Sequence, residues 1–337
     1  MRISFYDGHG KLAYNPNTEK NVGVGGTETV IIQAAKALAE RGHDVSVYIK
    51  CNFPSIYDKV RYYKFQDYVP SEEDVLIGFE NFPVNYNAAK VINYVNRPYT
   101  DDVLRYPNVD KIFVVSNWHR DLFASTLPAE LVSKMEVIIS GVADYFYMED
   151  VEKQKYNISY SGHPGKGGMS SLVPVVERLK LRFKEAELHV YGGGALWGWN
   201  NDQYRPIYDK MIHNGVLYHG QIGKEDLALR LNQAKIYLYP VANHHKETFC
   251  LGILEAMAAG CVVIASNSGN VRNLVADKGF IIEGDIQHYS WAMEATEKIA
   301  ELFENPELLD KMGKESREYA KQFTWEKTAE QIERALE

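Results

Sequence analysis

Short runs of apolar residues alternate with longer amphipathic stretches along the whole chain of 337 residues. In the first half, six such runs are predicted to be strands, at 2–6, 44–49, 74–79, 90–95, 111–116 and 135–140. They are rich in Val, Ile, Phe and Tyr with little polar alternation, which is typical of strands buried in a parallel sheet. Residues 27–44 carry a helical apolar stripe that ends at Gly42.

A second series begins after residue 150. Further strands are predicted within 155–162, 186–194, 216–220, 235–240 and 261–266. Helices are predicted at 171–183, at 224–234 and around Glu255. Two alternating series predict an α/β protein with two Rossmann-like domains facing each other across a cleft. We place these domains at 1–150 and 151–320, because residues 145–154 lose periodicity and gain charge.

The last part of the chain, 291–337, is helical in pattern almost throughout, with a break at 322–325. Thr324 is predicted to cap a final helix that begins at Trp325. We expect residues 321–337 to cross back to the N-terminal domain. A helix that only packs at the C-terminus is the alternative.

Composition restricts the partners and the compartment. The formal net charge is -8 and neither half of the chain is basic, which argues against a nucleic-acid partner. The three cysteines, Cys51, Cys250 and Cys261, have no disulfide-framework or metal-site spacing, so we expect a reducing, cytoplasmic location. No apolar run reaches about 18 residues, so we expect no transmembrane segment, while peripheral membrane contact stays open.

Two glutamates, Glu247 and Glu255, lie eight residues apart before and within an apolar stretch. On one helix they would stand about 12 Å apart along the axis, on overlapping sides. Two such carboxylates can hold polyols at the two ends of a ligand, with a phosphate at the helix start between them. A nucleoside diphosphate sugar has that layout. The alternative is a charge at the helix start and a solvated residue on the helix surface.

Three glycine-rich stretches follow or lie near predicted strands, at 23–26, 161–168 and 191–200. The first opens the helix at residue 27, but Glu28 occupies the third glycine position of a dinucleotide fingerprint, which disfavours an NAD oxidoreductase. In the second, Lys166 stands among glycines as a candidate phosphate clamp, with a flexible turn as the alternative. In the third, Trp197 and Trp199 are expected to belong to an insertion that packs on the surface.

No Asp-x-Asp pair occurs in the chain, and the adjacent His244 and His245 are poorly spaced to share one ion. We therefore expect a site without metal or cofactor, where cationic side chains neutralise the diphosphate.

These motifs occur together in an order that resembles the retaining glycosyltransferases of the GT-B fold, specifically family four. Nearly the whole chain takes part in the resemblance. The segments that carry it are 23–48, 110–123, 137–146, 217–275 and 322–329. Within 217–275, the E-x7-E element of that family falls on Glu247 and Glu255.

The resemblance implies roles for individual residues. Glu247 would lie against the transferred sugar and Lys166 would neutralise the diphosphate, and these two are the expected catalytic residues. Glu255 would hold the ribose hydroxyls. Further donor contacts are implied for Gly25, Gly26, His163, Ile222, Thr248, Phe249, Cys250 and Leu251.

Three positions depart from the pattern of that family. His163 stands nearest to a phosphate-binding Arg, so Lys246 or Arg178 is an alternative cation. Asn96 stands where a His is frequent, and Cys250 stands where a Gly is usual. Acceptor contacts are expected from Tyr- and Asn-rich loops in the first half, with Glu80, Asn81 and Asn96 as the candidates.

The resemblance implies transfer of a hexose from a UDP-, GDP- or ADP-sugar to a carbohydrate or lipid-linked acceptor, as in polysaccharide biosynthesis. It also implies retention of configuration through front-face attack assisted by the leaving phosphate. The two-carboxylate scheme of glycosidases needs acids roughly 5–10 Å apart, closer than expected here. The alternatives are a sugar-nucleotide-binding protein with weak or lost transferase activity and a GT-B epimerase or phosphorylase.

Overall fold

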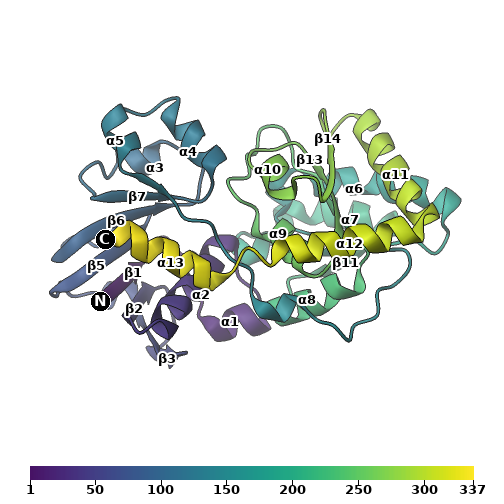
Figure 1. Cartoon of the computed structure of the whole chain (residues 1–337). Coiled ribbons are helices and arrows are strands. Elements are labelled where there is room, and N and C mark those ends of the chain that lie inside the picture. Colours follow the sequence, from purple (N-terminus) through teal and green to yellow (C-terminus); the bar gives the residue numbers. More distant parts are fainter. The chain divides into compact units, whose positions relative to one another are not determined.

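The chain divides into two units, each built on its own sheet (Figure 1). The computed structural model describes all residues, 1–337. The first unit comprises residues 1–19, 24–141 and 323–337, and the second comprises 20–23 and 142–322. The main boundaries thus fall after residues 141 and 322, whereas the sequence pattern placed them at 150 and 320.

The first unit contains an eight-stranded sheet in the order β3-β4-β2-β1-β5-β6-β7-β8. Its strands are β1 (Arg2–Tyr6), β2 (Asp44–Ile49), β3 (Ser55–Tyr57), β4 (Val60–Lys64), β5 (Glu73–Phe79), β6 (Ala88–Val95), β7 (Lys111–Val114) and β8 (Met135–Val137). All neighbouring pairs are parallel except β3 with β4. The six predicted strands are confirmed, although β8 is shorter than expected.

The hairpin of β3 and β4 was not predicted, because its strands are short. Its turn places two consecutive non-glycine residues, Asp58 and Lys59, at φ values of 48° and 66°. Both central residues of a two-residue hairpin turn of this kind need positive φ, and neither residue type announces it as Asn-Gly would.

Helices of the first unit pack on strands near both ends of the sheet. They are α1 (Pro16–Asn21), α2 (Gly26–Glu40), α3 (Asp101–Leu104), α4 (Asn117–Ala124), α5 (Ala129–Ser133) and α13 (Trp325–Leu336). The predicted long helix is α2, and Gly42 follows it at a φ of 91°, which a glycine adopts without strain. Helix α2 packs on β2 and β4, while α4 packs on β7 and β8.

The terminal helix α13 is part of the first unit. Thr324 caps it by accepting a hydrogen bond from the Lys327 N–H, which confirms the predicted cap. Helix α13 packs against α2. The Thr328 hydroxyl donates to the carbonyl of Ile139 at 2.8 Å, and Gln331 accepts from the Ile139 N–H at 2.7 Å.

The second unit contains a six-stranded, wholly parallel sheet in the order β11-β10-β9-β12-β13-β14. Its strands are β9 (Asn157–Ser161), β10 (Glu187–Tyr191), β11 (Leu217–Gly220), β12 (Ile236–Tyr239), β13 (Val262–Ser266) and β14 (Gly279–Ile282). The five predicted strands are confirmed, and β14 was missed. Because all strands are parallel, the loops after β9, β12 and β13 begin at one edge of the sheet.

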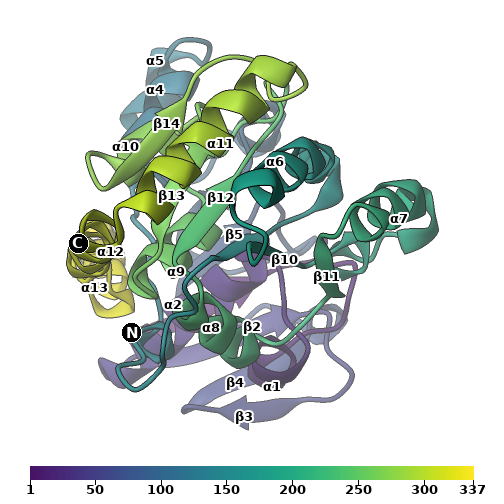
Figure 2. The same ribbon diagram turned by 90° about the vertical axis from the view of Figure 1, so that its right-hand side faces the viewer.

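Helices form two groups around this sheet (Figure 2). Helix α6 (Met169–Arg182) packs with α7 (Arg205–His213) and α11 (Tyr289–Glu304). Helix α9 (Leu251–Ala258) packs with α8 (Lys224–Gln233), α10 (Val271–Val275) and α12 (Pro306–Ala320). The predicted helical tail has one further break, where Asn305 caps α12 and Pro306 begins it. None of the helices is both long and apolar enough to cross a membrane.

A substitution at Gly141 tests whether the start of α13 packs directly against this residue. A Cβ atom there would overlap the backbone of Trp325, so Gly141→Ala must displace the start of α13. We expect a loss of roughly 1–3 kcal/mol in the free energy of unfolding, as for other overpacked sites.

Gly42→Ala is the control without a clash, because a Cβ at Gly42 has nothing within 4 Å, although Gly42, unlike Gly141, has a positive φ. Backbone strain alone should cost it about 1 kcal/mol. Thermal unfolding of both variants is the measurement, and an equal fall in Tm would show that α13 does not press on Gly141.

Candidate active site

Lys166 belongs to the glycine-rich loop that follows β9, at the end of a 3-10 turn, Pro164–Lys166. Gly167 continues the chain at a φ of 80°. A Cβ at Gly168 would overlap the carbonyl of Pro240, so this loop lies directly on the segment after β12. The Lys166 carbonyl accepts the Ala242 N–H at 2.9 Å, which fixes the two segments to each other.

Glu247 does not stand on a helix, and the expectation that both glutamates share one helix is wrong. Helix α9 begins only at Leu251, after Cys250 has turned the chain with a left-handed backbone, φ 79°. The backbone of Glu247 is held instead by the loop after β13. Its carbonyl accepts the Asn270 N–H at 2.8 Å, and a Cβ at Gly269 would overlap that carbonyl.

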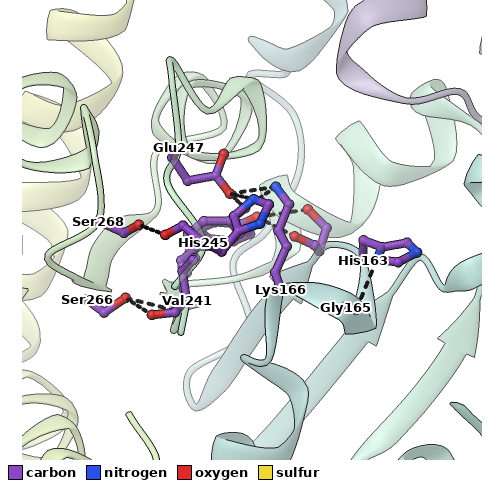
Figure 3. A network of polar contacts seen from close by, with 11 residues as sticks. His163, Gly165, Lys166, Val241, His245, Glu247, Ser266 and Ser268 are labelled. Carbon is purple, nitrogen blue, oxygen red and sulfur yellow. Dashed lines mark hydrogen bonds and ion pairs between the residues drawn. The ribbon is translucent and has the colours of Figure 1, made fainter. Parts of the chain in front are cut away.

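Serine side chains attach the same loop to the segment before Glu247. Ser266 accepts the Val241 N–H at 2.8 Å, and Ser268 donates to the carbonyl of His245 at 2.6 Å (Figure 3). Three loops at one edge of the sheet are therefore joined by hydrogen bonds, and they bring Lys166 and Glu247 together.

The side chains of Lys166, Tyr239 and Glu247 form a closed triangle. Lys166 Nζ lies 2.6 Å from Glu247 Oε1 and donates to the Tyr239 hydroxyl at 2.9 Å. That hydroxyl donates to the same Oε1 at 3.0 Å. Figure 3 shows the Lys166 amine pointing at the Glu247 carboxylate, with His245 beside them. His245 Nε2 lies 3.7 Å from Glu247 Oε1. Every donor reaches Oε1, and Oε2 accepts no hydrogen bond within the chain.

The charges of this group are set by burial and by each other. Burial raises the pKa of Glu247, but the charge of Lys166 and the hydrogen bonds from Lys166 and Tyr239 outweigh it, so that pKa is lowered overall. Burial lowers the pKa of Lys166, but Glu247 outweighs it, so that pKa is raised. Burial lowers the pKa of His245, so this ring is neutral near pH 7. The site holds one cation and one carboxylate.

His163 does not supply a second cation in this arrangement. Its Nδ1 accepts the Gly165 N–H at 2.9 Å, so that nitrogen is unprotonated and the ring is neutral. Trp197 and Tyr204 meet the ring edge to face, with centroids 4.8 and 5.4 Å away. Trp197 is half-buried against His163 and Trp199 is exposed, so the expected surface insertion packs against the glycine-rich loop of Lys166.

Arg178, an alternative cation, lies about 13 Å along α6 from its first residue, where its guanidinium bonds Tyr289. It is therefore outside this group of side chains. Lys246, the other alternative, is exposed on the segment before Glu247.

Glu255 lies within α9 and is only 3% exposed. Its Oε1 forms an ion pair with Nζ of Lys224, the first residue of α8, which is itself buried. As at Glu247, the second oxygen, Oε2, accepts no hydrogen bond within the chain. Burial excludes the alternative of a solvated surface residue, and a buried carboxylate needs such a partner.

The other predicted donor residues occupy the starts of helices and a loop. Thr248, Phe249 and Cys250 lie between Glu247 and α9, and Leu251 is the first residue of α9. Ile222 lies in the loop between β11 and α8. In the first unit, Gly25 is the N-cap of α2 and Gly26 begins it. Their contacts with a donor stay predictions.

The acceptor-side candidates come together at the ends of β5 and β6. Glu80 has a φ of 58°, and its Oε1 accepts the N–H groups of Asn96 and Arg97 at 2.9 and 3.0 Å. Its Oε2 pairs with the Arg97 guanidinium at 2.5 Å. Asn81 accepts the Gly8 N–H at 2.7 Å and donates to the Phe79 carbonyl at 2.6 Å. Burial raises the pKa of Glu80 despite Arg97.

Tyr239 and Lys224 are the functional candidates that sequence reasoning missed. Both stood inside predicted elements, Tyr239 at the end of an apolar strand and Lys224 at a helix start, where nothing in the pattern sets them apart. A buried glutamate needs a cationic partner, which could have indicated that a lysine lies nearby. This need does not identify which lysine in the sequence is the partner. No group of three or more His, Cys, Asp or Glu side chains is arranged to hold a metal ion.

Solved structures that resemble the chain define its fold class. Sucrose-phosphate synthase from Thermosynechococcus elongatus aligns over 99% of this chain and 97% of that one, at 19% identity and a TM-score of 0.74. Anabaena HepE in complex with UDP-glucose aligns over 100% and 99%, at 14% identity and a TM-score of 0.70. The two-sheet α/β architecture is that of the GT-B glycosyltransferases, so the predicted fold class is confirmed.

The sequence defines the family. The profile described as glycosyl transferases group 1 matches residues 147–319, more than half of the chain. The chain belongs to this family.

Curated relatives match a smaller share of the chain. An uncharacterized glycosyltransferase of Methanocaldococcus jannaschii is 24% identical over 233 residues, 68% of this chain and 60% of that protein. The phosphatidyl-myo-inositol mannosyltransferase of Mycobacterium leprae is 22% identical over 243 residues, 66% and 61% of the two chains. The matches thus span less than two thirds of the length of these relatives.

Cys250 gives a test of the turn before α9. Its positive φ costs a residue with a side chain about 1–2 kcal/mol, whereas glycine adopts it freely. We expect Cys250→Gly to be more stable than Cys250→Ala by about 1 kcal/mol in thermal or chemical unfolding. At Ala256, in the middle of the same helix, Ala256→Gly should instead lose about 1 kcal/mol. A more stable Cys250→Ala would rule out the left-handed turn.

The Lys224–Glu255 pair gives a second test. Lys224→Met leaves the Glu255 carboxylate buried without its cation, which should cost about 3 kcal/mol of unfolding free energy. The double variant Lys224→Met/Glu255→Gln should recover much of that loss, because no unpaired charge remains. The free energies of unfolding of the wild type, both single variants and the double variant form a double-mutant cycle. Simple additivity of the two single effects would refute the pairing.

Proposed function

We propose that the chain transfers a sugar from a nucleoside diphosphate donor to a hydroxyl acceptor with retention of anomeric configuration, as a member of family four. The observation that supports this most is the paired Lys166 and Glu247 at the carboxyl edge of the second sheet. Ligands of open parallel sheets bind at that edge. The family and the fold are consistent with this activity.

The leaving diphosphate is the part of the reaction that needs a cation. Lys166 provides one, held among loop glycines where backbone groups can also approach a phosphate. The N-terminus of α9, which begins at Leu251 after the turn at Cys250, adds free N–H groups and the positive end of a helix dipole. Together they would stabilise the charge that develops as the sugar–phosphate bond breaks.

The sugar and the ribose would each meet a buried carboxylate. Glu247 and Glu255 both keep Oε2 unbonded within the chain, and their lysine partners occupy Oε1. An ionised carboxylate oxygen is an acceptor only, so it suits sugar hydroxyls. We assign the sugar to Glu247 and the ribose to Glu255, and Lys166 and Glu247 are the proposed catalytic residues.

The remaining donor contacts are proposed for the backbone of Thr248, Phe249, Cys250 and Leu251, the loop at Ile222, and Gly25 and Gly26. On the acceptor side we propose Asn81 and Asn96, with Glu80 holding the Asn96 turn in place. The acceptor would be a carbohydrate or a lipid-linked sugar. We propose that the reaction needs neither metal nor cofactor.

A panel of UDP-, GDP- and ADP-sugars tests this function, first by thermal shift and then by release of nucleoside diphosphate. With the preferred donor, we expect Lys166→Met and Glu247→Gln each to lower kcat/KM by roughly 100- to 1000-fold, as for the loss of one transition-state contact. Arg178→Met is the matched control, because that cation lies on α6 against Tyr289 and should leave kcat/KM unchanged.

The products separate the alternatives. A new glycoside with the donor's anomeric configuration supports the proposal, and an inverted product contradicts retention. An isomerised donor would indicate an epimerase. Donor binding without any turnover would indicate a sugar-nucleotide-binding protein.

A further inference from the structure

The hydroxyl of Tyr239 is the only side-chain group that bonds both Lys166 and Glu247. It accepts from Lys166 Nζ at 2.9 Å and donates to Glu247 Oε1 at 3.0 Å. The three groups therefore form a chain of hydrogen bonds that runs in one direction, from the ammonium through the phenol to the carboxylate. Bonds in such a chain strengthen each other in a buried setting.

The ring that carries this hydroxyl is immobilised. Tyr239 ends β12 and is 2% exposed. It stacks on Tyr237 of the same strand, with centroids 5.6 Å apart and an interplanar angle of 14°. It also stacks on Tyr160 of β9 at 5.8 Å and 24°. Packed aromatic neighbours fix the ring, so the hydroxyl position is set by the sheet rather than by a mobile loop.

The hydroxyl also keeps its proton. Burial, the Cys250 thiol and the Glu247 carboxylate raise the pKa of Tyr239 well above its ordinary value. The phenol therefore keeps the proton that it donates to Glu247 near neutral pH. A serine or water in that place would hold the carboxylate less firmly, because neither is anchored by a packed ring.

We propose that Tyr239 is a positioning residue of the transfer reaction. It occupies Oε1 of Glu247 and thereby turns Oε2 toward the donor sugar, while it holds the Lys166 ammonium in place for the diphosphate. This inference rests on the proposed function, because it assigns Tyr239 a task in the same site. Tyr239 touches neither sugar nor phosphate in this account and acts through its two partners.

The test is Tyr239→Phe, with Tyr237→Phe as the matched control. Both changes remove one buried phenol hydroxyl from the same face of β12, but the Tyr237 hydroxyl bonds Ser161 and not Glu247. For Tyr239→Phe we expect kcat/KM with the preferred nucleotide sugar to fall by roughly 10- to 100-fold, the usual size of a hydrogen bond to a charged group. The fall should appear mainly in kcat, since Glu247 contacts the reacting sugar.

The pH dependence of kcat/KM distinguishes a positioning role of Tyr239 from a purely structural role. The hydrogen bond from Tyr239 is one of the causes that lower the pKa of Glu247. Without it the pKa rises, so the acid limb of kcat/KM should move to higher pH in Tyr239→Phe and stay in place in Tyr237→Phe. In a Glu247→Gln background, Tyr239→Phe should have a smaller effect than in the wild type, because the carboxylate that it orients is gone and only its contact with Lys166 is left to lose.

The outcomes are distinct. An active wild type whose rate and acid limb are unchanged by Tyr239→Phe overturns the inference alone. Equal shifts in both phenylalanine variants, with equal falls in Tm, also overturn it and leave a purely structural role. A wild type that turns over no nucleotide sugar overturns the proposed function, and the inference with it.

Discussion

The loops at the carboxyl edge of the second sheet meet at one ion pair, that of Lys166 with the buried Glu247. A buried carboxylate without a cation would cost several kcal/mol, so the loops after β9, β12 and β13 must meet for the charges to be tolerated. The hydrogen bonds of Ser266, Ser268 and Asn270 to the chain around Glu247 hold those loops together. The same contacts place the cation and the carboxylate at the edge of the sheet where a ligand can reach them.

One arrangement recurs at three buried glutamates in the chain. Glu247 pairs with Lys166, Glu255 with Lys224, and Glu80 with Arg97. In the second unit the lysine takes only Oε1 and leaves Oε2 unbonded, which suits a ligand hydroxyl. At Glu80 both oxygens are engaged, one by two backbone N–H groups and one by the guanidinium. The third glutamate therefore fixes the turn at Asn96 and Arg97.

Much of the fold could be predicted because apolar periodicity reports burial directly. The parallel strands, α2 and the Thr324 cap each have a strong local signal, and the structure contains them. The hairpin of β3 and β4 has none, since Asp58 and Lys59 adopt positive φ without a glycine. The start of α9 was predicted wrongly for the same reason. Cys250 is not a residue type that indicates a left-handed backbone, so Glu247 was predicted to be helical, although α9 begins only at Leu251.

The site was predictable in part. Glu247, Glu255 and Lys166 stood out by residue type and by their neighbours, and the structure pairs two of them. Tyr239 and Lys224 could not be found, because their roles come from contacts between segments far apart in sequence, 73 residues from Tyr239 to Lys166 and 31 from Lys224 to Glu255. The spacing of residues along the sequence does not indicate such long-range contacts.

The central claim is that the Lys166–Glu247 pair receives an activated sugar, and a crystal structure with the preferred nucleoside diphosphate bound tests it most directly. The account predicts a diphosphate oxygen within hydrogen-bond distance of Lys166 Nζ at the start of α9, with the ribose at Oε2 of Glu255. A nucleotide bound elsewhere, with Lys166 and Glu247 closed only on each other and on Tyr239, would contradict it.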